Sequence, residues 1–504
     1  MISELLNDVV RRQPGQCALV DGSERITFEE LSERVRAARD WLRETLDPKP
    51  GDAIAVSLDN SWQFVASFFA AAELGCVLAP CNPQWRAVEL RAYAARVRFR
   101  GAIIEPRFSR EWNQILDATP ANSLFTADAI PSNALASSSS APASIDATED
   151  APAFFLSTSG STGTPRLVPR SHRNLRATAE NVGTTLEIVP GRRFLSVVPF
   201  FSSNGFHNGM LVPLLRGATV VMMRQFTPPG CAELANREQV DTLFGSPFVY
   251  GYLVDSISDP ASLSSLQYCY SGGARLPSNV ADRWRLRFGV PIRQSYGMSE
   301  TGLITAERTA ETRESSVGSC IGHPVRNVEV IILGPGGESL GLDEIGELAV
   351  RSGSLMSGYF GEPELNRSRF HNGFFRTGDL GCFDSTGRVH LTGRMGRGIN
   401  IAGTKIDPVE IERAVEMLPN VASCHVDAVP NGRGGEVVRA RVVPLEGRPV
   451  TRRDVIEQCR QQLAEYKLPR VIEFLETSPA NLAGKILRDR PPNSAAPSEP
   501  GGST

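Results

Sequence analysis

The sequence contains no long uninterrupted apolar run, and this absence argues against a membrane-spanning protein. Its most apolar stretch, from Phe64 to Pro80, is broken by Glu73 and Gly75 and is too short to cross a bilayer comfortably. This stretch instead predicts a buried helix that leads into a strand. The first ten residues include acidic side chains and no continuous apolar segment, so they do not indicate a secretory signal. We therefore expect a cytoplasmic protein.

An excess of basic residues is also missing. The 53 Lys and Arg residues are outnumbered by 56 Asp and Glu residues, which gives a net charge of −3. Nucleic-acid binding usually needs clustered positive charge. We expect the partners to be small molecules or proteins rather than nucleic acid.

The nine cysteines are scattered singly between Cys17 and Cys459, and no C-x-x-C pair occurs among them. Without such a pair, or a cluster of His and Cys at the spacing of zinc ligands, the sequence predicts neither a zinc site nor a dithiol redox motif. Cys76 and Cys81 are the closest pair, but they lie in a short apolar segment that favours core packing. We interpret the cysteines as reduced thiols of the core.

The sequence does contain the alternation of helices and strands that is typical of an α/β protein. Helical patterns such as TFEELSERVRAARDWL alternate with apolar runs such as AIAVSL, first from Ile26 onward and again from AFFL at 153–156 to Tyr296. Between them, the Ser-, Ala- and Pro-rich stretch 132–150 predicts an exposed, mobile connection. We therefore expect two α/β lobes.

The pattern changes twice in the second half of the chain. Short strands and turns over 328–393 predict a small β-rich subdomain, and the sequence after Arg394 predicts a small α+β module. At 504 residues the chain exceeds what one core usually supports. The predicted organisation is a large N-terminal domain over 1–394, a small mobile α+β C-terminal domain over 395–490 and a disordered tail over 491–504.

The segment TSGSTGTPR, from Thr158 to Arg166, has the composition of a phosphate-binding loop. It follows an apolar strand and precedes a helix that is expected to start near Ser171. Its glycines let backbone amides approach phosphate oxygens, and its hydroxyl groups can donate to a triphosphate. It is neither a Walker loop nor a G-x-S-x-G hydrolase turn. Taken alone, such a loop is as often a plain flexible turn, so its interpretation depends on the other motifs.

Four further motifs follow in order: SYGMSE at 295–300, FRTGDL at 375–380, GRMGRGIN from Gly393 and NLAGKILR from Asn481. Together with the loop, this set resembles the adenylate-forming superfamily of acyl-CoA synthetases, amino-acid adenylation domains and luciferases. The resemblance spans nearly the whole chain. It implies ATP and Mg²⁺ as cofactors and a carboxylic acid as substrate.

The resemblance also implies roles for single residues. Tyr296 would stack on adenine, Asp379 would accept the ribose hydroxyls, and Glu300 would bind the Mg²⁺ that bridges phosphate oxygens. Lys485 would hold the substrate carboxylate against the α-phosphate, so Glu300 and Lys485 are the predicted catalytic residues. Gly396 falls at the hinge position. The predicted ATP-binding residues are Thr158, Ser159, Gly160, Ser161, Thr162, Gly163, Arg166, Gly272, Gly273, Ala274, Ser295, Tyr296, Gly297, Ser299, Asp379 and Arg394. The predicted substrate pocket comprises Ser202, Ser203, His207 and Ser271.

Three departures from the family pattern matter. Arg166 replaces the lysine that is usual after the loop proline, which keeps a positive charge for phosphate but offers a wider, forked contact. Ser202 stands where many relatives have a gating histidine, and His207 five residues later either faces the acyl pocket or is simply packed. Asn400 and Ala402 stand where several CoA ligases carry lysines, so phosphate contacts to CoA are weakened or moved.

We therefore expect an ATP-dependent carboxylic-acid ligase that forms an acyl-AMP, releases pyrophosphate and passes the acyl group to the thiol of CoA or of a carrier protein's phosphopantetheine. The acid is expected to be an aryl or medium aliphatic acid, because PFFSSNG lacks the aspartate with which amino-acid adenylation domains hold an ammonium group. A protein of another class also fits, namely a nucleotide-binding protein that has lost turnover, with Arg166 and Ser202 as signs of decay. The retained Glu300, Asp379 and Lys485 argue against it.

Overall fold

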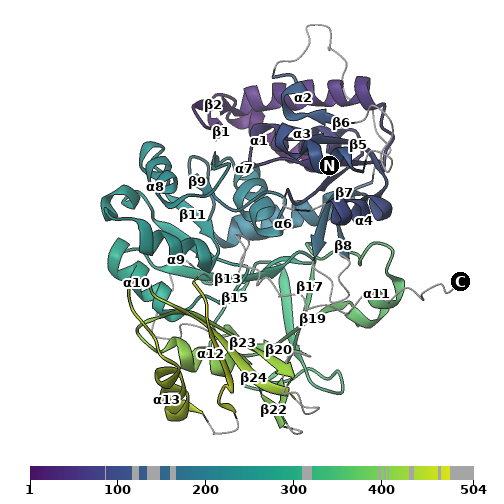
Figure 1. The fold of residues 1–504 in the computed structure, drawn as a ribbon. Helices are drawn as coiled ribbons and strands as arrows, with labels where there is room; N and C mark the ends of the chain where they lie inside the picture. Colours follow the sequence, from purple (N-terminus) through teal and green to yellow (C-terminus); the bar gives the residue numbers. More distant parts are fainter. Residues whose placement is uncertain are drawn as a thin grey trace, which may run out of the picture.

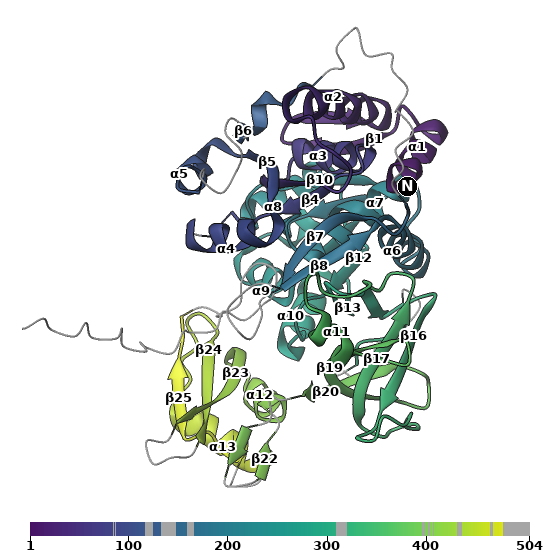
Figure 2. The same cartoon turned by 90° about the vertical axis from the view of Figure 1, so that its right-hand side faces the viewer.

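The computed structural model describes residues 1–83, 85, 87–115, 124–132, 148–158, 166–308, 320–395, 399–401, 404–406, 408–430, 436–463 and 467–476. These residues form a large domain with three sheets and a small domain made of the C-terminal elements (Figures 1 and 2). The small domain lies beside helix α10 (Ser278–Phe288) and strand β20 (Val389–Arg394) of the large domain. This confirms the predicted α/β class and the division into a large and a small domain.

The first sheet of the large domain has nine strands in the order β15-β14-β13-β12-β11-β9-β10-β1-β2. Its central strands run parallel, and antiparallel strands occupy both edges. Helices α8 (Pro228–Arg237), α9 (Pro247–Ser256) and α10 cover one face through a core that includes the fully buried Tyr250 and Trp284. The strands are β1 (Cys17–Asp21), β2 (Glu24–Thr27), β9 (Arg193–Ser196), β10 (Thr219–Met222), β11 (Thr242–Gly245), β12 (Tyr268–Ser271), β13 (Ile292–Met298), β14 (Gly302–Ala306) and β15 (His323–Pro324).

The second sheet has six strands in the order β6-β5-β3-β4-β7-β8, of which only the last pair is antiparallel. Side chains alternate along β3, so that Ile54 and Val56 pack with helices α2 (Phe28–Leu46) and α3 (Trp62–Glu73), while Ala53 and Ala55 pack with α4 (Ala87–Val97). The sheet is therefore covered on both faces. Its strands are β3 (Ala53–Ser57), β4 (Val77–Pro80), β5 (Phe99–Ile104), β6 (Leu124–Thr126), β7 (Pro152–Thr158) and β8 (Arg166–Ser171).

The chain crosses between the two lobes in a way that differs from the sequence prediction. The segment AFFL was expected to open the second lobe, but it lies in β7, which pairs with β4 in the six-stranded sheet. Conversely, β1 and β2 at the start of the chain join the nine-stranded sheet through β10. The prediction was wrong here because distant packing partners, not local periodicity, decide which parallel strands become neighbours. As a result, Thr158 and Arg166 lie on the last two strands at one edge of the six-stranded sheet.

Local predictions from the sequence fare better. The apolar stretch forms helix α3 and strand β4 as expected, and Ser61 caps the helix by accepting from the Phe64 backbone amide. Helix α6 (His172–Thr185) begins directly after Ser171, whose hydroxyl accepts from the Asn174 amide. The remaining helical elements of the large domain include α1 (Ile2–Arg12), α5 (Ser109–Asn113), α7 (Val212–Leu215) and a π-helix over Gly205–Leu211.

The predicted β-rich subdomain is confirmed as a third sheet that includes β16, β17, β18, β19 and β20. Helix α11 (Pro363–Arg369) connects its second and third strands. The remaining strands are β16 (Val328–Leu333), β17 (Gly346–Ser352), β18 (Phe370–His371) and β19 (Phe374–Phe383).

The small domain packs two helices against one sheet, as the α+β prediction requires. Strands β23, β24 and β25 form the sheet, and Ile411, Val415, Val455 and Cys459 bury its helical side. The hairpin β21–β22 lies at the end of this domain that is remote from the large domain (Figures 1 and 2). The elements are β21 (Ile399–Ile401), β22 (Thr404–Ile406), α12 (Pro408–Glu416), β23 (Val421–Pro430), β24 (Glu436–Pro444), α13 (Arg452–Gln462) and β25 (Val471–Phe474).

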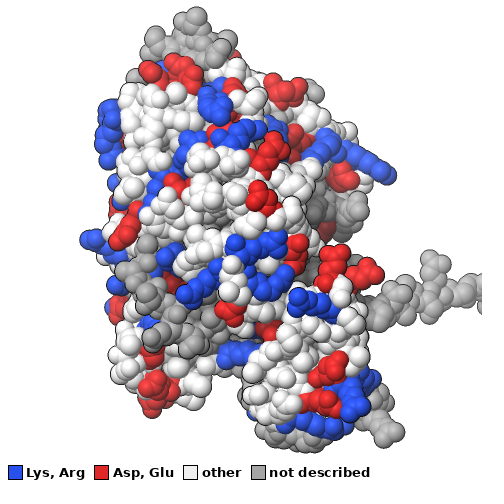
Figure 3. Space-filling model, turned by 90° about the vertical axis from the view of Figure 1, so that its left-hand side faces the viewer, with Lys and Arg blue, Asp and Glu red and all other residues white. Residues whose placement is uncertain are grey.

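The boundary predicted at Arg394 stays a prediction, because Gly396 and its two following residues lie outside the described part, as does the chain after residue 476. None of the helices in the described ranges reaches the length and apolarity that a bilayer crossing demands. On the face drawn in Figure 3, acidic and basic side chains alternate over most of the surface, and several basic side chains lie together near its middle.

Candidate active site

The candidate phosphate loop connects two paired strands. Thr158 at the end of β7 lies opposite Arg166 at the start of β8, so the antiparallel pair brings the two ends of the loop together. The residues between them, Ser159, Gly160, Ser161, Thr162 and Gly163 among them, lie outside the described residues. The guanidinium of Arg166 lies 5.8 Å from the ring centre of Tyr359. A positive charge therefore lies at the end of the β7–β8 pair where the loop begins and ends.

Tyr296, Asp379 and Arg394 form one polar cluster, although they come from two different sheets. The hydroxyl of Tyr296 on β13 donates to Asp379 Oδ2 at 2.5 Å, and Arg394 Nε lies 3.3 Å from Asp379 Oδ1. The pairing of β19 with β20 places Asp379 directly opposite Arg394. Burial, and next the Asp379 carboxylate, raise the pKa of Tyr296 well above its usual value, so its phenol stays protonated. The structure thus brings together the residues predicted to meet adenine and ribose.

Two predicted ATP-binding glycines lie where a side chain would not fit without adjustment. A Cβ on Gly272 would lie 3.0 Å from Ser295 Oγ, whose hydroxyl donates to the Ser271 carbonyl at 3.0 Å. A Cβ on Gly297 would lie 2.3 Å from the carbonyl oxygen of Gly302, at the irregular pairing between β13 and β14. Gly273 and Ala274 continue the same loop after β12 and are exposed, and Gly273 has a φ of +88°. The exposed backbone of this loop is therefore available to a ligand.

Glu300 follows β13 and is 6% exposed. The hydroxyl of Tyr359 donates to its Oε1 at 2.8 Å, and its backbone carbonyl accepts from the Met356 amide at 2.8 Å. The described residues contain no group of three His, Cys, Asp or Glu side chains placed to hold a metal ion. Mg²⁺ in nucleotide enzymes commonly uses one or two carboxylates and takes its other ligands from phosphate and water. One fixed, buried carboxylate fits an ion that arrives with a triphosphate.

A buried arginine, which the sequence did not single out as a site residue, holds the Ser299–Glu300 turn by a hydrogen bond to its backbone. Arg170 on β8 is fully buried, donates from Nη1 to the Ser299 carbonyl at 3.0 Å and from Nη2 to Thr178 Oγ1 at 3.1 Å. Burial lowers its pKa to about 10, which still leaves the guanidinium charged at neutral pH, and nearby Glu300 opposes that shift. Ser299 itself is 8% exposed. Strand β8 therefore both closes the loop and fixes the turn that carries Glu300.

The predicted pocket residues on the π-helix side have mixed roles. His207 is 1% exposed, and its Nδ1 lies 3.2 Å from Ser203 Oγ. Burial, assisted by the charge of Arg170, holds the pKa of His207 well below its usual value, so the imidazole is neutral. Ser202 instead bonds its own chain, donating to the Pro199 carbonyl at 2.7 Å and accepting from the Gly205 amide. Ser271, the fourth predicted residue, is also buried, at the end of β12.

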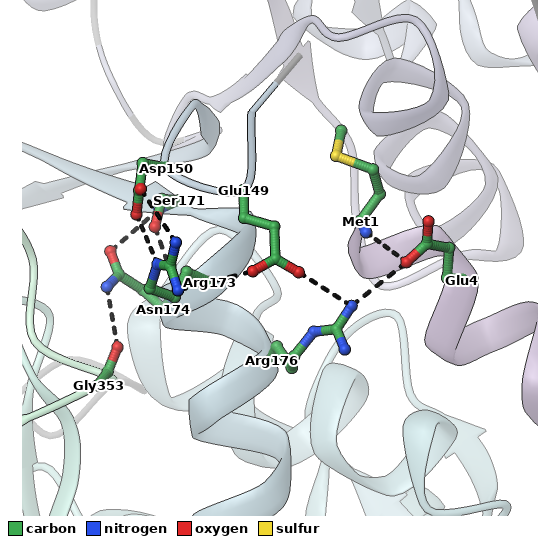
Figure 4. A network of polar contacts seen from close by, with 9 residues as sticks. All are labelled: Met1, Glu4, Glu149, Asp150, Ser171, Arg173, Asn174, Arg176 and Gly353. Carbon is green, nitrogen blue, oxygen red and sulfur yellow. Dashed lines mark hydrogen bonds and ion pairs between the residues drawn. The ribbon is translucent and has the colours of Figure 1, made fainter. Parts of the chain in front are cut away.

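A surface network anchors the helix that follows β8 (Figure 4). Arg176 on α6 lies 3.3 Å from carboxylate oxygens of both Glu4 and Glu149, and Arg173 donates to Asp150 at 2.7 Å. The amide of Asn174 donates to the Gly353 carbonyl of the β-rich subdomain at 3.0 Å. Exposed ion pairs contribute only a few tenths of a kcal/mol each, up to about 1 kcal/mol. Together with the Asn174 hydrogen bond, they join three distant segments to the strand–helix unit that begins at Arg166.

Comparison with known proteins decides the family. A model of the AMP-binding enzyme family matches residues 6–360, and a model of the AMP-binding enzyme C-terminal domain matches residues 410–485. The chain belongs to the AMP-binding enzyme family. This confirms the resemblance that the ordered motifs indicate.

Relatives and solved structures match the AMP-binding enzyme chain along almost its whole length. Feruloyl-CoA synthase from an Amycolatopsis species is 31% identical over 488 residues, which cover 95% of this chain and 96% of that protein. The crystal structure of ATP-bound MatB from Rhodopseudomonas palustris is 25% identical and superposes with a TM-score of 0.86 over 96% of this chain and 97% of MatB. Apo MatB, at the same coverage and identity, gives a TM-score of 0.78.

Two predicted residues of this AMP-binding enzyme, Lys485 and Gly396, lie outside the described residues. Sequence reasoning missed Tyr359 and Arg170. A signal for Tyr359 was present, since Gly358 and Gly361 flank a Tyr-Phe pair and both adopt positive φ. Arg170 gave no such signal, because β8 has the sequence RLVPRS and nothing in it shows which of its two arginines the fold will bury.

Proposed function

We propose that this AMP-binding enzyme is an ATP-dependent acid–thiol ligase that forms an acyl-AMP with release of pyrophosphate and then an acyl thioester with CoA. The observation that carries the proposal is the polar cluster of Tyr296, Asp379 and Arg394, together with the buried Glu300 in the turn that follows β13. Relatives whose names are CoA synthases or CoA ligases over nearly the full chain support the same activity.

In the first step, the residues of this chain bind and orient rather than react. Tyr296 and the 272–274 loop hold adenine, Asp379 accepts from ribose hydroxyls, and the hairpin ending at Arg166 holds phosphates. Glu300 would hold Mg²⁺, which when bound would neutralise charge at the phosphates. The acid carboxylate attacks the α-phosphorus and pyrophosphate leaves, so no protein nucleophile is needed. Lys485 is the proposed residue that aligns the two anions.

For the acid, we propose an aryl or medium aliphatic substrate. The similarity to a feruloyl-CoA synthase supports an aromatic acid. His207, a predicted pocket residue on the π-helix, is a neutral imidazole, and the segment 199–205 has no aspartate to hold an ammonium group. These features suit an uncharged acyl group better than an amino acid.

For the acceptor, we propose CoA ahead of a carrier protein, because the curated relatives are named for CoA. Asn400 and Ala402, which stand where several CoA ligases carry lysines, would favour a carrier instead. Comparing thioester yield from free CoA and from phosphopantetheinylated carrier proteins separates the two. Transfer to carriers alone would replace CoA as the acceptor and leave the adenylation step standing.

The decisive experiment is acid-dependent exchange of labelled pyrophosphate into ATP, run with a panel of aryl and aliphatic acids. Exchange that depends on one acid and on Mg²⁺ would support the proposal and identify the substrate. An absence of exchange with every acid, while ATP still binds in calorimetry, would favour the alternative of a nucleotide-binding protein without turnover.

We further propose that the enzyme works in a reducing compartment such as the cytoplasm. All nine thiols are unpaired, and Cys81, Cys231 and Cys269 are among those that are fully buried. Burial raises the pKa of Cys231 and of Cys269 to about 12, so these thiols are unreactive. A thiol titration that finds paired cysteines in the purified native protein would contradict this.

A further inference from the structure

An ion pair joins the two domains directly beside the proposed adenine site. Arg275 follows the loop of Gly272, Gly273 and Ala274 without a break, and its Nη2 lies 2.5 Å from Oε2 of Glu416 at the end of α12 in the small domain. The side chains of Arg275 and Glu416 are 22% and 4% exposed. A contact this enclosed is screened far less by salt than a surface pair.

The partners of Glu416 show that its carboxylate is held for this contact. Its second oxygen accepts from the Cys424 amide at 3.1 Å, so both oxygens are engaged. Near the start of α10, shortly after Arg275, the side-chain amide of Asn279 donates to the carbonyl oxygens of Val421 and Ala422. The small domain thus contacts the large one through the Arg275–Glu416 ion pair and through the hydrogen bonds of Asn279 at the start of α10.

The arrangement held by this contact matches a nucleotide-loaded relative better than an empty one. The ATP-bound form of MatB superposes on the whole chain more closely than its apo form does, although sequence identity and coverage are the same. In this arrangement the β21–β22 hairpin, which carries Asn400, points away from the large domain (Figure 2). A thioester step that needed this hairpin at the site would require the small domain to turn.

We propose that Arg275 and Glu416 are positioning residues that dock the small domain on the adenine loop for adenylation and that separate before the thioester step. The proposal rests on the two-step function proposed above. An ion pair that forms in only one of two domain arrangements stabilises that arrangement over the other by the free energy of the pair. Because Arg275 is continuous with the 272–274 loop, a nucleotide that orders this loop also orders the docking residue.

The test uses reversed charges in the full chain. Arg275→Glu and Glu416→Arg each place like charges at the contact, and the double variant restores an opposite pair; Glu416→Gln is the milder variant, because it keeps the shape and the acceptor for the Cys424 amide. Contacting charged residues couple by amounts that correspond to about 2- to 100-fold in an equilibrium. Arg283→Glu, at an ion pair with Asp255 that joins α10 to α9 within the large domain, is the matched control.

Two readouts are compared: pyrophosphate exchange, and thioester formation from a supplied acyl-adenylate. We expect each single reversal to lower exchange about 10-fold, and Glu416→Gln to lower it less, while thioester formation is unchanged or faster. The double variant should recover exchange. Arg283→Glu should change neither rate. Equal loss of both half-reactions, or failure of the double variant to recover exchange while it folds with wild-type stability, would overturn the proposal.

A distance measurement separates failure of this inference from failure of the proposed function. Dyes are attached through unnatural amino acids at the exposed Leu342 and Gln461, one in each domain, because nine cysteines preclude thiol labelling. With ATP bound, the single reversals should broaden the distance distribution and the double variant should narrow it again. An unchanged distribution in Arg275→Glu would overturn the docking role even if the enzyme showed no exchange at all.

Discussion

Tyr359→Phe removes one hydroxyl group and tests whether the carboxylate of Glu300 is oriented for a metal ion. Tyr359 is 5% exposed, and its hydroxyl donates to Glu300 Oε1 at 2.8 Å. A hydrogen bond to a charged group contributes about 1.5–3 kcal/mol, and about 1.4 kcal/mol corresponds to a tenfold change. We therefore expect pyrophosphate exchange at limiting Mg²⁺ to fall roughly 10- to 100-fold, with partial recovery at saturating Mg²⁺.

The assay is pyrophosphate exchange titrated with Mg²⁺, together with thermal unfolding without ligands. The control is Tyr252→Phe, because the Tyr252 side chain is 37% exposed on α9 and packs on Phe248 with ring centres 4.3 Å apart. Loss of the donor to a buried carboxylate should also lower the free energy of unfolding by about 1–3 kcal/mol. If the Mg²⁺ midpoint of Tyr359→Phe equals that of the wild type, this hydrogen bond does not orient a metal ligand.

Four further predictions follow from the site and its supports. Lys485→Ala should lower adenylation on the order of 10²- to 10³-fold and spare thioester formation from acyl-adenylate; equal damage to both half-reactions would contradict its role. Arg166→Lys should stay active, whereas Arg166→Ala should lower the apparent affinity for ATP in the same exchange assay. An unchanged apparent ATP affinity in Arg166→Ala would show that Arg166 does not contact phosphate. Gly297→Ala should lower the free energy of unfolding by several times RT, because the added Cβ would lie 2.3 Å from the Gly302 carbonyl oxygen. If the variant unfolds like the wild type, β13 moves aside without a cost in stability. Burial lowers the pKa of His172 to about 4, so its neutral form supports the fold above pH 6.5 and this support is lost as pH falls toward 4; His172→Gln should flatten that pH dependence of the unfolding free energy.

The sequence predicts elements well where one local pattern decides the structure. Helix α3 and strand β4 follow from a continuous apolar stretch, and the start of α6 follows from Ser171 and Asn174, which cap one another. The lobe to which a strand belongs is not local information. Strand β7 reads as the start of a new lobe after a polar linker, yet its apolar face packs with helices of the first lobe.

The same distinction holds for the site. Tyr296, Asp379 and Glu300 lie in motifs whose spacing carries the family pattern, and the structure brings Tyr296 and Asp379 into contact. Arg170 and Tyr359 act through positions that only the fold creates, one beneath the Ser299 carbonyl and the other across from Glu300. A sequence pattern shows the groups that touch a ligand more readily than the groups that hold them in place.

We propose that the cluster around Asp379 links nucleotide binding to the position of the small domain. One oxygen of its carboxylate accepts from Tyr296 and the other faces Arg394, so both are engaged before any ribose arrives. A ribose hydroxyl that donates to Asp379 must share or displace one of these partners. Arg394, with a side chain 43% exposed at the end of β20, is the partner with more freedom to move. Arg394 directly precedes the segment in which the hinge is predicted. We therefore expect a change in its contact with Asp379 to affect the proposed turning of the small domain.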